Sequence, residues 1–314
     1  MDHVRLLLLT GLMLLLCACA GQSTYMLAQS VLQQLPSTTY VEQVSFYPQD
    51  DYQCGPASLA MLLSQRGFAD TPESLKGRVY LPQRQGSLQV EMVAAAREHG
   101  LLVYPLNKSL LALLREVAAG NAVLVMQNLG FNWMPQWHYA VVVGYDLNTQ
   151  EIIVHSGTQK AQREPFSLFM RLWNRSERWA VIALPADQLP ASAEPLAYLR
   201  AASDLEQSRQ LDAAKRAYTT ALNAWPEQAA ARFGLGNVAW TQNQPEQAVA
   251  QFRTLVSDFP TLKAGWNNLA VALTAVGCTQ AARQAEACAN GMQVQTAPPL
   301  PKTDPLSCEI PACP

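Results

Sequence analysis

The sequence contains few charged residues. Asp, Glu, Lys and Arg make up 15% of the 314 residues, and the formal net charge is −2. A nucleic-acid-binding protein needs basic side chains to neutralise phosphates, and no basic stretch is present, so we expect no nucleic-acid partner. The sequence also lacks a phosphate-binding glycine loop, a dinucleotide fingerprint and a spaced set of metal ligands, so we expect no metal and no cofactor.

Long apolar runs are also scarce, and the clearest one lies at the N-terminus. Leu6–Leu16 is almost unbroken, follows a segment with one Arg, and is followed by the small residues of Cys17–Gly21. A membrane-spanning helix needs about 20 apolar residues, so this run is short for that purpose. The pattern is typical of a cleaved signal peptide, which we place at 1–18.

The four residues Leu16-Cys17-Ala18-Cys19 resemble the lipobox of bacterial lipoproteins. That resemblance implies a mature chain that begins at a lipid-modified Cys19, with a tether over 19–37. Because residue 20 is not Asp, it also implies sorting to the outer membrane, facing the periplasm. The alternative is an ordinary secretory signal, cleaved after Ala18 or Ala20.

The cysteines fall into separate groups along the chain. Besides two in the signal region, Cys54 stands alone, and four lie near the C-terminus: Cys278, Cys288, Cys308 and Cys313. Disulfides persist outside the cytoplasm, so we interpret the late four as structural staples. Four cysteines allow three pairings, and we favour Cys278 with Cys288 and Cys308 with Cys313.

Secondary-structure patterns change along the first half of the chain. Helical periodicity covers 57–66, 88–99 and 109–119, whereas short runs rich in Val and Ile follow at 122–126, 139–145, 151–155 and 179–184. Helices first and strands second predict an α+β domain, which we place at 38–188.

The second half of the chain is Ala-rich and repeats itself. Ala202, Gly236 and Ala270 are spaced by 34 residues, as are Pro226 and Pro260. This interval, with small residues where two helices cross and a Pro after the second helix, is typical of tetratricopeptide repeats. We therefore predict a linker over 189–194, an all-α domain of about three units over 195–292, and an irregular tail over 293–314.

The segment around Cys54 has the features of a nucleophile site. Gly55-Pro56 follows it directly and an apolar helical pattern comes next, which places the thiol at a helix N-terminus. The exposed N–H groups there favour a thiolate, which is the reactive form of cysteine. An imidazole nearby would complete the activation.

Three histidines remain once the signal is removed. His99 lies at a helix end closed by Gly100, where a cation is stabilised by the helix dipole, so we assign it a structural role. His138 begins the apolar run His138–Tyr145, which would hold an imidazole at the mouth of a strand. Together with the cysteine motif upstream, His138 is the candidate general acid and base.

The motif Cys54-Gly55-Pro56-Ala57, together with His138–Tyr145, resembles the bacteriocin-processing peptidases and their stand-alone relatives, which have a papain-like fold. The resemblance covers roughly 44–184, and the repeat tail is similar to that of a group of exported bacterial proteins. It implies Cys54 as nucleophile, His138 as acid and base, and Gln49 as the oxyanion-hole amide. The family usually has that Gln one position earlier, where Pro48 stands.

A second departure concerns the residue that orients the catalytic imidazole. The family generally has an Asp on the strand after the catalytic His, whereas His155 or Ser156 occupies that place here. Either can hold the ring, and we take His155 as the third member. Neither stabilises the imidazolium as a carboxylate does. Asp146 lies at the far end of the His138 strand, where its geometry is poor.

Two further groups of residues have simple interpretations. Phe131, Trp133 and Trp137 precede His138, where they either line a substrate groove or belong to the core. Asp50-Asp51 is interpreted as a solvated loop, because no other ligand residue accompanies it.

The leading hypothesis is a membrane-anchored cysteine peptidase that cleaves an envelope peptide or protein, with the repeats recruiting substrate or a protein partner. Relatives that remove double-glycine leaders are fused to a transporter, and no transporter domain is present here, so that substrate is not inherited. One alternative is a non-catalytic envelope scaffold that binds peptides through a degenerate peptidase domain. Another is amide or acyl transfer by the same Cys–His chemistry.

Overall fold

The computed structural model describes residues 34–49, 53–291 and 308–313. Signal peptide, Cys19 and most of the tether therefore lie outside the described residues, as do Asp50 and Asp51. Among the residues that are described, no helix is long and apolar enough to cross a membrane.

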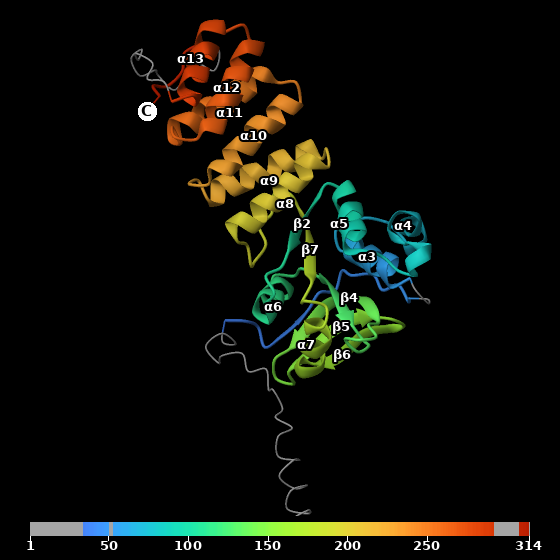
Figure 1. Cartoon of the computed structure of the whole chain (residues 1–314). Coiled ribbons are helices and arrows are strands. Elements are labelled where there is room, and N and C mark those ends of the chain that lie inside the picture. The colour runs from blue at the N-terminus through green and yellow to red at the C-terminus, as the bar shows by residue number, and fades with distance from the viewer. Residues whose placement is uncertain (1–33, 50–52, 292–307, 314) are drawn as a thin grey trace, which may run out of the picture.

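The first part of the chain is a mixed helix and sheet domain (Figure 1). Its helices, including one 3-10 turn, are α3 (Cys54–Ser64), α4 (Pro72–Val79), η1 (Pro82–Arg84), α5 (Gln89–Glu98), α6 (Leu110–Ala118) and α7 (Phe166–Asn174). Its strands are β1 (Thr38–Tyr40), β2 (Leu101–Pro105), β3 (Val123–Asn128), β4 (Trp137–Asp146), β5 (Glu151–Ser156), β6 (Gln159–Pro165) and β7 (Ala180–Pro185). The predicted α+β class is confirmed.

The strands form one antiparallel sheet in the order β2-β7-β3-β4-β5-β6. Strand β4 is its organising element, because β3 and β1 pair with successive parts of one edge and β5 pairs with the other. The three predicted helices and four predicted strands of this domain correspond to α3, α5, α6, β3, β4, β5 and β7. The sequence patterns missed β1, β2, β6, α4 and α7; several of these are too short or too polar for a periodic signal.

The second part consists of three antiparallel helix pairs stacked in sequence. They are α8 (Pro195–Gln207) with α9 (Leu211–Ala224), α10 (Ala229–Thr241) with α11 (Pro245–Asp258), and α12 (Lys263–Ala275) with α13 (Thr279–Ala289). Gly236 shows why the repeat needs small residues, since a Cβ there would lie 2.4 Å from the Phe252 ring. Pro226 and Pro260 follow the second helix of their units, as predicted.

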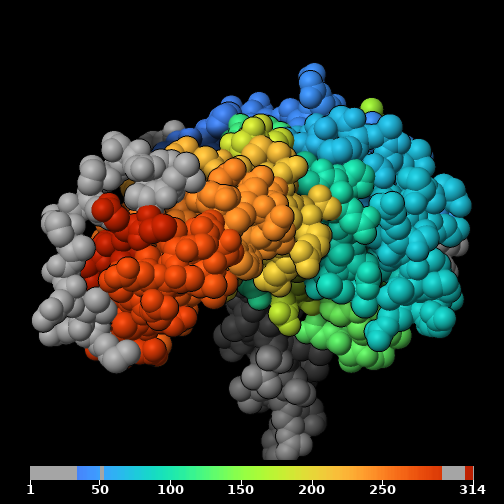
Figure 2. Space-filling model, turned by 90° about the horizontal axis from the view of Figure 1, so that it is seen from above, coloured from blue at the N-terminus to red at the C-terminus, as the bar shows by residue number. Residues whose placement is uncertain are grey.

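The repeats pack directly against the sheet domain. Helices α8 and α9 lie beside β2 and β7 in Figure 1, and Figure 2 shows the two parts packed directly against each other. One apolar cluster runs from the sheet into these helices, including Tyr198 and Leu205. An ion pair between Arg97 and Asp204 crosses the same boundary.

The predicted linker is also held in place. The carboxylate of Glu116, which is fully buried, accepts hydrogen bonds from the backbone N–H of Ser192 at 2.7 Å and from its hydroxyl at 2.6 Å. The Tyr104 hydroxyl accepts the N–H of Glu194 at 3.0 Å. These contacts give the repeats a defined orientation relative to the sheet.

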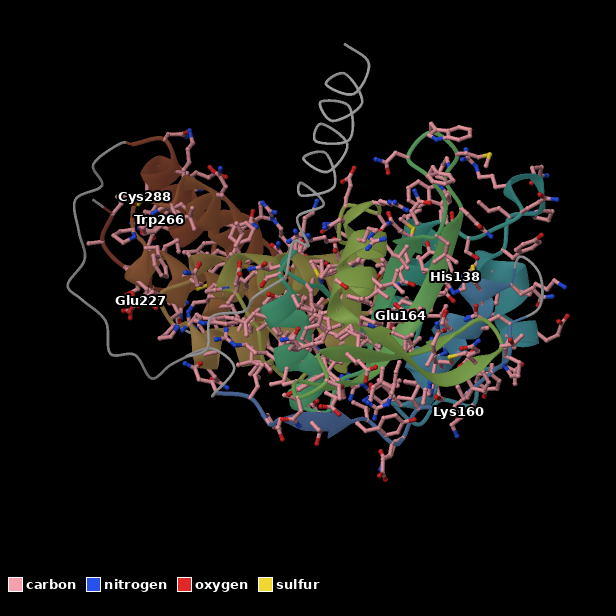
Figure 3. The ribbon with its side chains drawn as sticks, turned by 90° about the horizontal axis from the view of Figure 1, so that it is seen from below. His138, Lys160, Glu164, Glu227, Trp266 and Cys288 are labelled. Atoms are coloured by element: carbon pink, nitrogen blue, oxygen red, sulfur yellow. A yellow bond between two sulfur atoms is a disulfide. The ribbon has the colours of Figure 1, made fainter. Side chains whose placement is uncertain are left out.

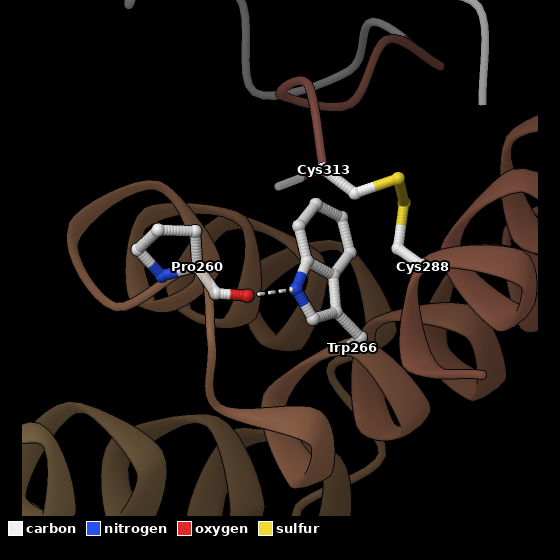
Figure 4. Close-up of a disulfide and its surroundings, with 4 residues drawn as sticks. All are labelled: Pro260, Trp266, Cys288 and Cys313. Carbon is white, nitrogen blue, oxygen red and sulfur yellow. Dashed lines mark hydrogen bonds between the residues drawn. A yellow bond between two sulfur atoms is a disulfide. The ribbon is translucent and has the colours of Figure 1, made fainter. Parts of the chain in front are cut away.

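The favoured disulfide pairing was wrong. Cys278 pairs with Cys308 and Cys288 pairs with Cys313. Cys278 is the N-cap of α13, and Cys288 lies in the last turn of the same helix. Ten residues of helix separate them by about 15 Å, which is beyond the reach of a disulfide. Both bridges instead fasten the C-terminal residues to the third helix pair, where Cys288–Cys313 lies beside the buried Trp266 (Figure 4).

Candidate active site

Helix α3 carries Cys54 as its first residue. Pro56 fits in this first turn, where a backbone N–H has no helical partner to lose. Gly55 permits a close approach, since a Cβ there would lie 2.1 Å from the Ser87 hydroxyl. The loop before α5 therefore packs over the start of α3, next to the thiol.

The Cys54 thiol is a free cysteine in a partly buried position. Burial raises the pKa of this thiol above its usual value, while the backbone N–H groups of Tyr139, Gly55 and Cys54 itself act in the opposite direction. The sequence predicts a thiolate at this helix end. Desolvation outweighs the N–H groups, which favours a protonated thiol at neutral pH.

His138 lies near the start of β4, next to the residue whose backbone contacts the thiol. Its Nε2 is 2.9 Å from the Ser156 hydroxyl, which leaves Nδ1 as the nitrogen available to a reacting group. Burial lowers the pKa of His138 to about 4. Among the described residues no hydrogen bond joins His138 to Cys54, and such bonds are often loose before substrate binds.

The choice of His155 as the third member was wrong. Side chains alternate along a strand, and His155 is paired with Val141 rather than with a residue on the face of His138. Its ring is fully buried, its Nδ1 accepts the backbone N–H of Ala161 at 3.1 Å, and it packs edge-on against Phe46. Ser156, the next residue, points to the other face and holds His138.

Gln49 lies beside the site but its amide is engaged. Its Nε2 donates to the Ser58 hydroxyl at 3.2 Å, and its Oε1 accepts the N–H of Gly157 at 3.2 Å. Ser58, one turn into α3, donates in turn to the carbonyl of Tyr139 at 3.1 Å. Gln49 therefore ties α3 and the turn after Ser156 to one another, and the oxyanion role stays a prediction.

Sequence reasoning missed a buried polar pair near the imidazole. Gln127 faces His138 across the β3–β4 register and donates through Nε2 to Glu164 on β6 at 3.2 Å. Burial raises the pKa of Glu164, against the effect of the Gln127 hydrogen bond. Figure 3 labels His138 and Glu164 in this region. The only signal in the sequence was a Gln at the end of an apolar strand.

The remaining histidine and acid are structural. His99 bridges the Ala95 carbonyl at 3.0 Å and the Asp70 carboxylate at 2.8 Å, at the end of α5. Asp146 accepts the N–H groups of the turn after β4 and pairs with Arg163. It lies at the opposite end of β4 from His138, as expected.

The three aromatic residues before His138 are not core residues. Phe131, Trp133 and Trp137 have exposed fractions of 58%, 79% and 52%. The part of the chain that the structure describes contains no cluster of His, Cys, Asp or Glu placed to hold a metal ion.

Two parts of the chain match known protein families. No curated protein matches the chain. A crystal structure of a putative C39-like peptidase from Bacillus anthracis is similar, with 17% identity over 48% of this chain and 98% of that one, at a TM-score of 0.39. A family model described as "Peptidase_C39 like family" matches residues 40–181, and tetratricopeptide repeat models match 199–263 and 235–290. The chain thus contains a peptidase C39-like domain followed by tetratricopeptide repeats.

Proposed function

We propose that this protein is a thiol peptidase in which Cys54 attacks a peptide carbonyl and His138 transfers the protons. One observation carries the proposal. The thiol lies at the first residue of α3 against the backbone of Tyr139, and the adjacent His138 is oriented by Ser156 so that its Nδ1 remains available.

The pKa shifts determine how the reaction starts. With the pKa of His138 lowered to about 4 and that of Cys54 raised, both groups are neutral at pH 7. The imidazole then acts as a general base, taking the thiol proton as sulfur attacks the carbonyl carbon. The backbone N–H of Cys54 at the helix start would stabilise the oxyanion. The imidazolium next protonates the leaving amine, and water hydrolyses the thioester.

Ser156 sets the speed of this reaction. A hydroxyl fixes the orientation of the His138 ring but carries no charge to stabilise the imidazolium. We therefore expect slow turnover that a carboxylate at position 156 would accelerate. The change Ser156→Asp would place the negative charge beside Nε2 and raise the pKa of His138.

The experiment follows hydrolysis of a quenched fluorescent peptide library by the purified full chain. Cys54→Ala and His138→Ala should abolish cleavage, and Ser156→Ala should leave slow cleavage. Ser156→Asp should raise kcat by about 10-fold, a fraction of the usual general acid–base contribution. Cleavage that persists at the wild-type rate in Cys54→Ala would refute the proposal.

We also propose that the protein works at the envelope, anchored through Cys19. The apolar N-terminal run and the lipobox-like residues support this. The measurement is incorporation of labelled palmitate into the full chain and into Cys19→Ala. Equal labelling of the two, or none in either, would remove the anchor from the proposal.

The repeats would serve to present a partner or substrate to the peptidase-like domain. Their fixed orientation supports this, because a bound chain would meet the site in a defined direction. Affinity purification with the full chain and with a variant altered on an exposed repeat side chain, such as Trp240→Ala, tests for such a partner.

The second candidate is a non-catalytic envelope scaffold that binds peptides. Two observations favour it: a hydroxyl replaces the carboxylate at the third position, and no hydrogen bond joins Cys54 to His138 among the described residues. This candidate predicts peptide binding that is unchanged in Cys54→Ala, together with no cleavage by Ser156→Asp.

A further inference from the structure

The loop between β3 and β4, together with the first residue of β4, exposes a group of apolar side chains next to the candidate site. We call it the aromatic platform, and its members with their exposed fractions are Leu129 (42%), Phe131 (58%), Trp133 (79%), Met134 (58%) and Trp137 (52%). Two of its rings, those of Phe131 and Trp133, stack with centroids 5.8 Å apart and planes at 11°. Exposed Trp, Phe and Met side chains gathered in one loop are typical of a binding surface.

Hydrogen bonds to its backbone groups, rather than packing of these apolar side chains, keep the loop in shape. The Asn128 side-chain oxygen accepts the N–H groups of Gly130 at 3.0 Å and Gln136 at 2.9 Å. The guanidinium of Arg175, the residue at the C-terminal end of α7, donates to the Gly130 carbonyl at 2.6 Å. A Cβ on Gly130 would lie 2.4 Å from the Met134 carbonyl oxygen, so only glycine permits this turn. The platform is therefore preorganised, which lowers the entropic cost of binding.

The charge of the surrounding chain defines the chemistry of the occupant. No Asp, Glu, Lys or Arg is present from Val117 to Tyr145. Arg175 reaches the loop from α7, but its guanidinium donates to the Gly130 carbonyl, so the platform itself offers an occupant apolar contacts. Segments that enter a lipid interface usually carry Lys or Arg to meet the headgroups, and this stretch has none, which favours a peptide over a bilayer.

The position of the platform indicates which peptide. Trp137 begins β4 two residues before Tyr139, whose backbone N–H contacts the Cys54 thiol, so the platform lies two strand residues, about 7 Å, from the nucleophile. We infer that the aromatic platform binds apolar side chains of the peptide substrate beside the bond that is cleaved. The inference rests on the proposed peptidase function and assigns it a substrate class, extended segments with large apolar residues.

The test uses two fluorescent peptidyl epoxides of equal length that alkylate Cys54. One carries Phe and Leu ahead of the epoxide and the other carries Gln and Ser. In the full chain we expect the apolar probe to label about tenfold faster, and tenfold corresponds to about 1.4 kcal/mol. Trp133→Ala should bring the two rates together. Tyr40→Ala, which removes another exposed aromatic ring, one paired with the opposite end of β4, should leave the ratio intact.

Controls separate this inference from the function on which it rests. Labelling by iodoacetamide should be equal in the wild type and in Trp133→Ala, because that reagent does not contact the platform. If neither epoxide labels Cys54 faster than it labels free cysteine, the peptidase proposal fails. The platform is then tested by fluorescence anisotropy with the same peptides lacking the epoxide. Equal affinities of the two peptides for the wild type would overturn it.

The same variants would also reveal two other occupants of the aromatic platform, a lipid surface or a second copy of this chain. Binding to vesicles of phosphatidylcholine and phosphatidylglycerol that is lost in Trp133→Ala, with an unchanged probe ratio, would assign the platform to a lipid surface and overturn the inference. A dimer in sedimentation velocity that dissociates in Trp133→Ala, again with an unchanged ratio, would assign it to a second copy. A probe ratio that Trp133→Ala does not change overturns the inference in every case.

Discussion

Replacement of Gln49 by Ala tests whether this residue positions the site or takes part in the reaction. The change removes the bond from Nε2 to Ser58 and leaves the N–H of Gly157 without its side-chain acceptor. Gln49 is 8% exposed, so water replaces these partners poorly. One lost hydrogen bond and one unsatisfied, partly buried donor together cost about 1–3 kcal/mol.

The companion variant is Ser58→Ala, which breaks the same bond from the other side, also removes the bond to the Tyr139 carbonyl, and leaves the Gln49 amide in place. If Gln49 acts by positioning, both variants should lose a similar free energy of unfolding in urea. Both should also increase hydrogen exchange at the Gly157 amide and lower kcat by less than about tenfold, because oxyanion stabilisation is retained.

The opposite result would refute this reasoning. Loss of an oxyanion donor lowers kcat by about 10²–10³. A drop of that size in Gln49→Ala, with unfolding unchanged and Ser58→Ala close to wild type, would show that the amide stabilises the oxyanion directly. The assay is hydrolysis of one cleaved library peptide under saturating conditions, with unfolding followed by tryptophan fluorescence.

Three further predictions follow from burial and packing. Because burial raises the pKa of Cys54, iodoacetamide should alkylate it more slowly than it alkylates free cysteine at pH 7. The alkylation rate of Cys54 should continue to rise at pH values where the rate of free cysteine no longer increases. A rate that is already constant at acidic pH would indicate a thiolate instead. Gly236→Ala should destabilise the repeats by about 1–3 kcal/mol, since the new methyl group would clash with the Phe252 ring. In Gly77→Ala, in α4, the new methyl group has no neighbour within 4 Å, so this variant should stabilise the chain by about 0.5–1 kcal/mol. Equal melting shifts for the two glycine variants would contradict the packing argument. Glu116→Gln should lower the free energy of unfolding by about 2 kcal/mol, because it weakens the hydrogen bonds that hold the linker. Hydrogen exchange in residues 189–194 should then be faster than in the wild type. Exchange as slow as in the wild type would show that other contacts hold the linker.

The sequence by itself predicted the features that depend on neighbouring residues. A Cys-Gly-Pro segment before an apolar helical pattern predicts a thiol at a helix start, and Cys54 begins α3. The spacing of 34 residues predicts stacked helix pairs, because each repeat packs through the same small positions. Strand β4 after His138 follows from an apolar run that contains three consecutive Val residues.

Other features depend on contacts between distant segments, and only the tertiary structure decided them. Whether His155 or Ser156 faces His138 depends on the β4–β5 register, where a shift of one residue exchanges the two faces. The disulfide pairing depends on where the C-terminal residues return to the third helix pair. The protonation of Cys54 depends on segments that bury it, because desolvation by residues far along the chain outweighs the local helix end that the sequence does reveal.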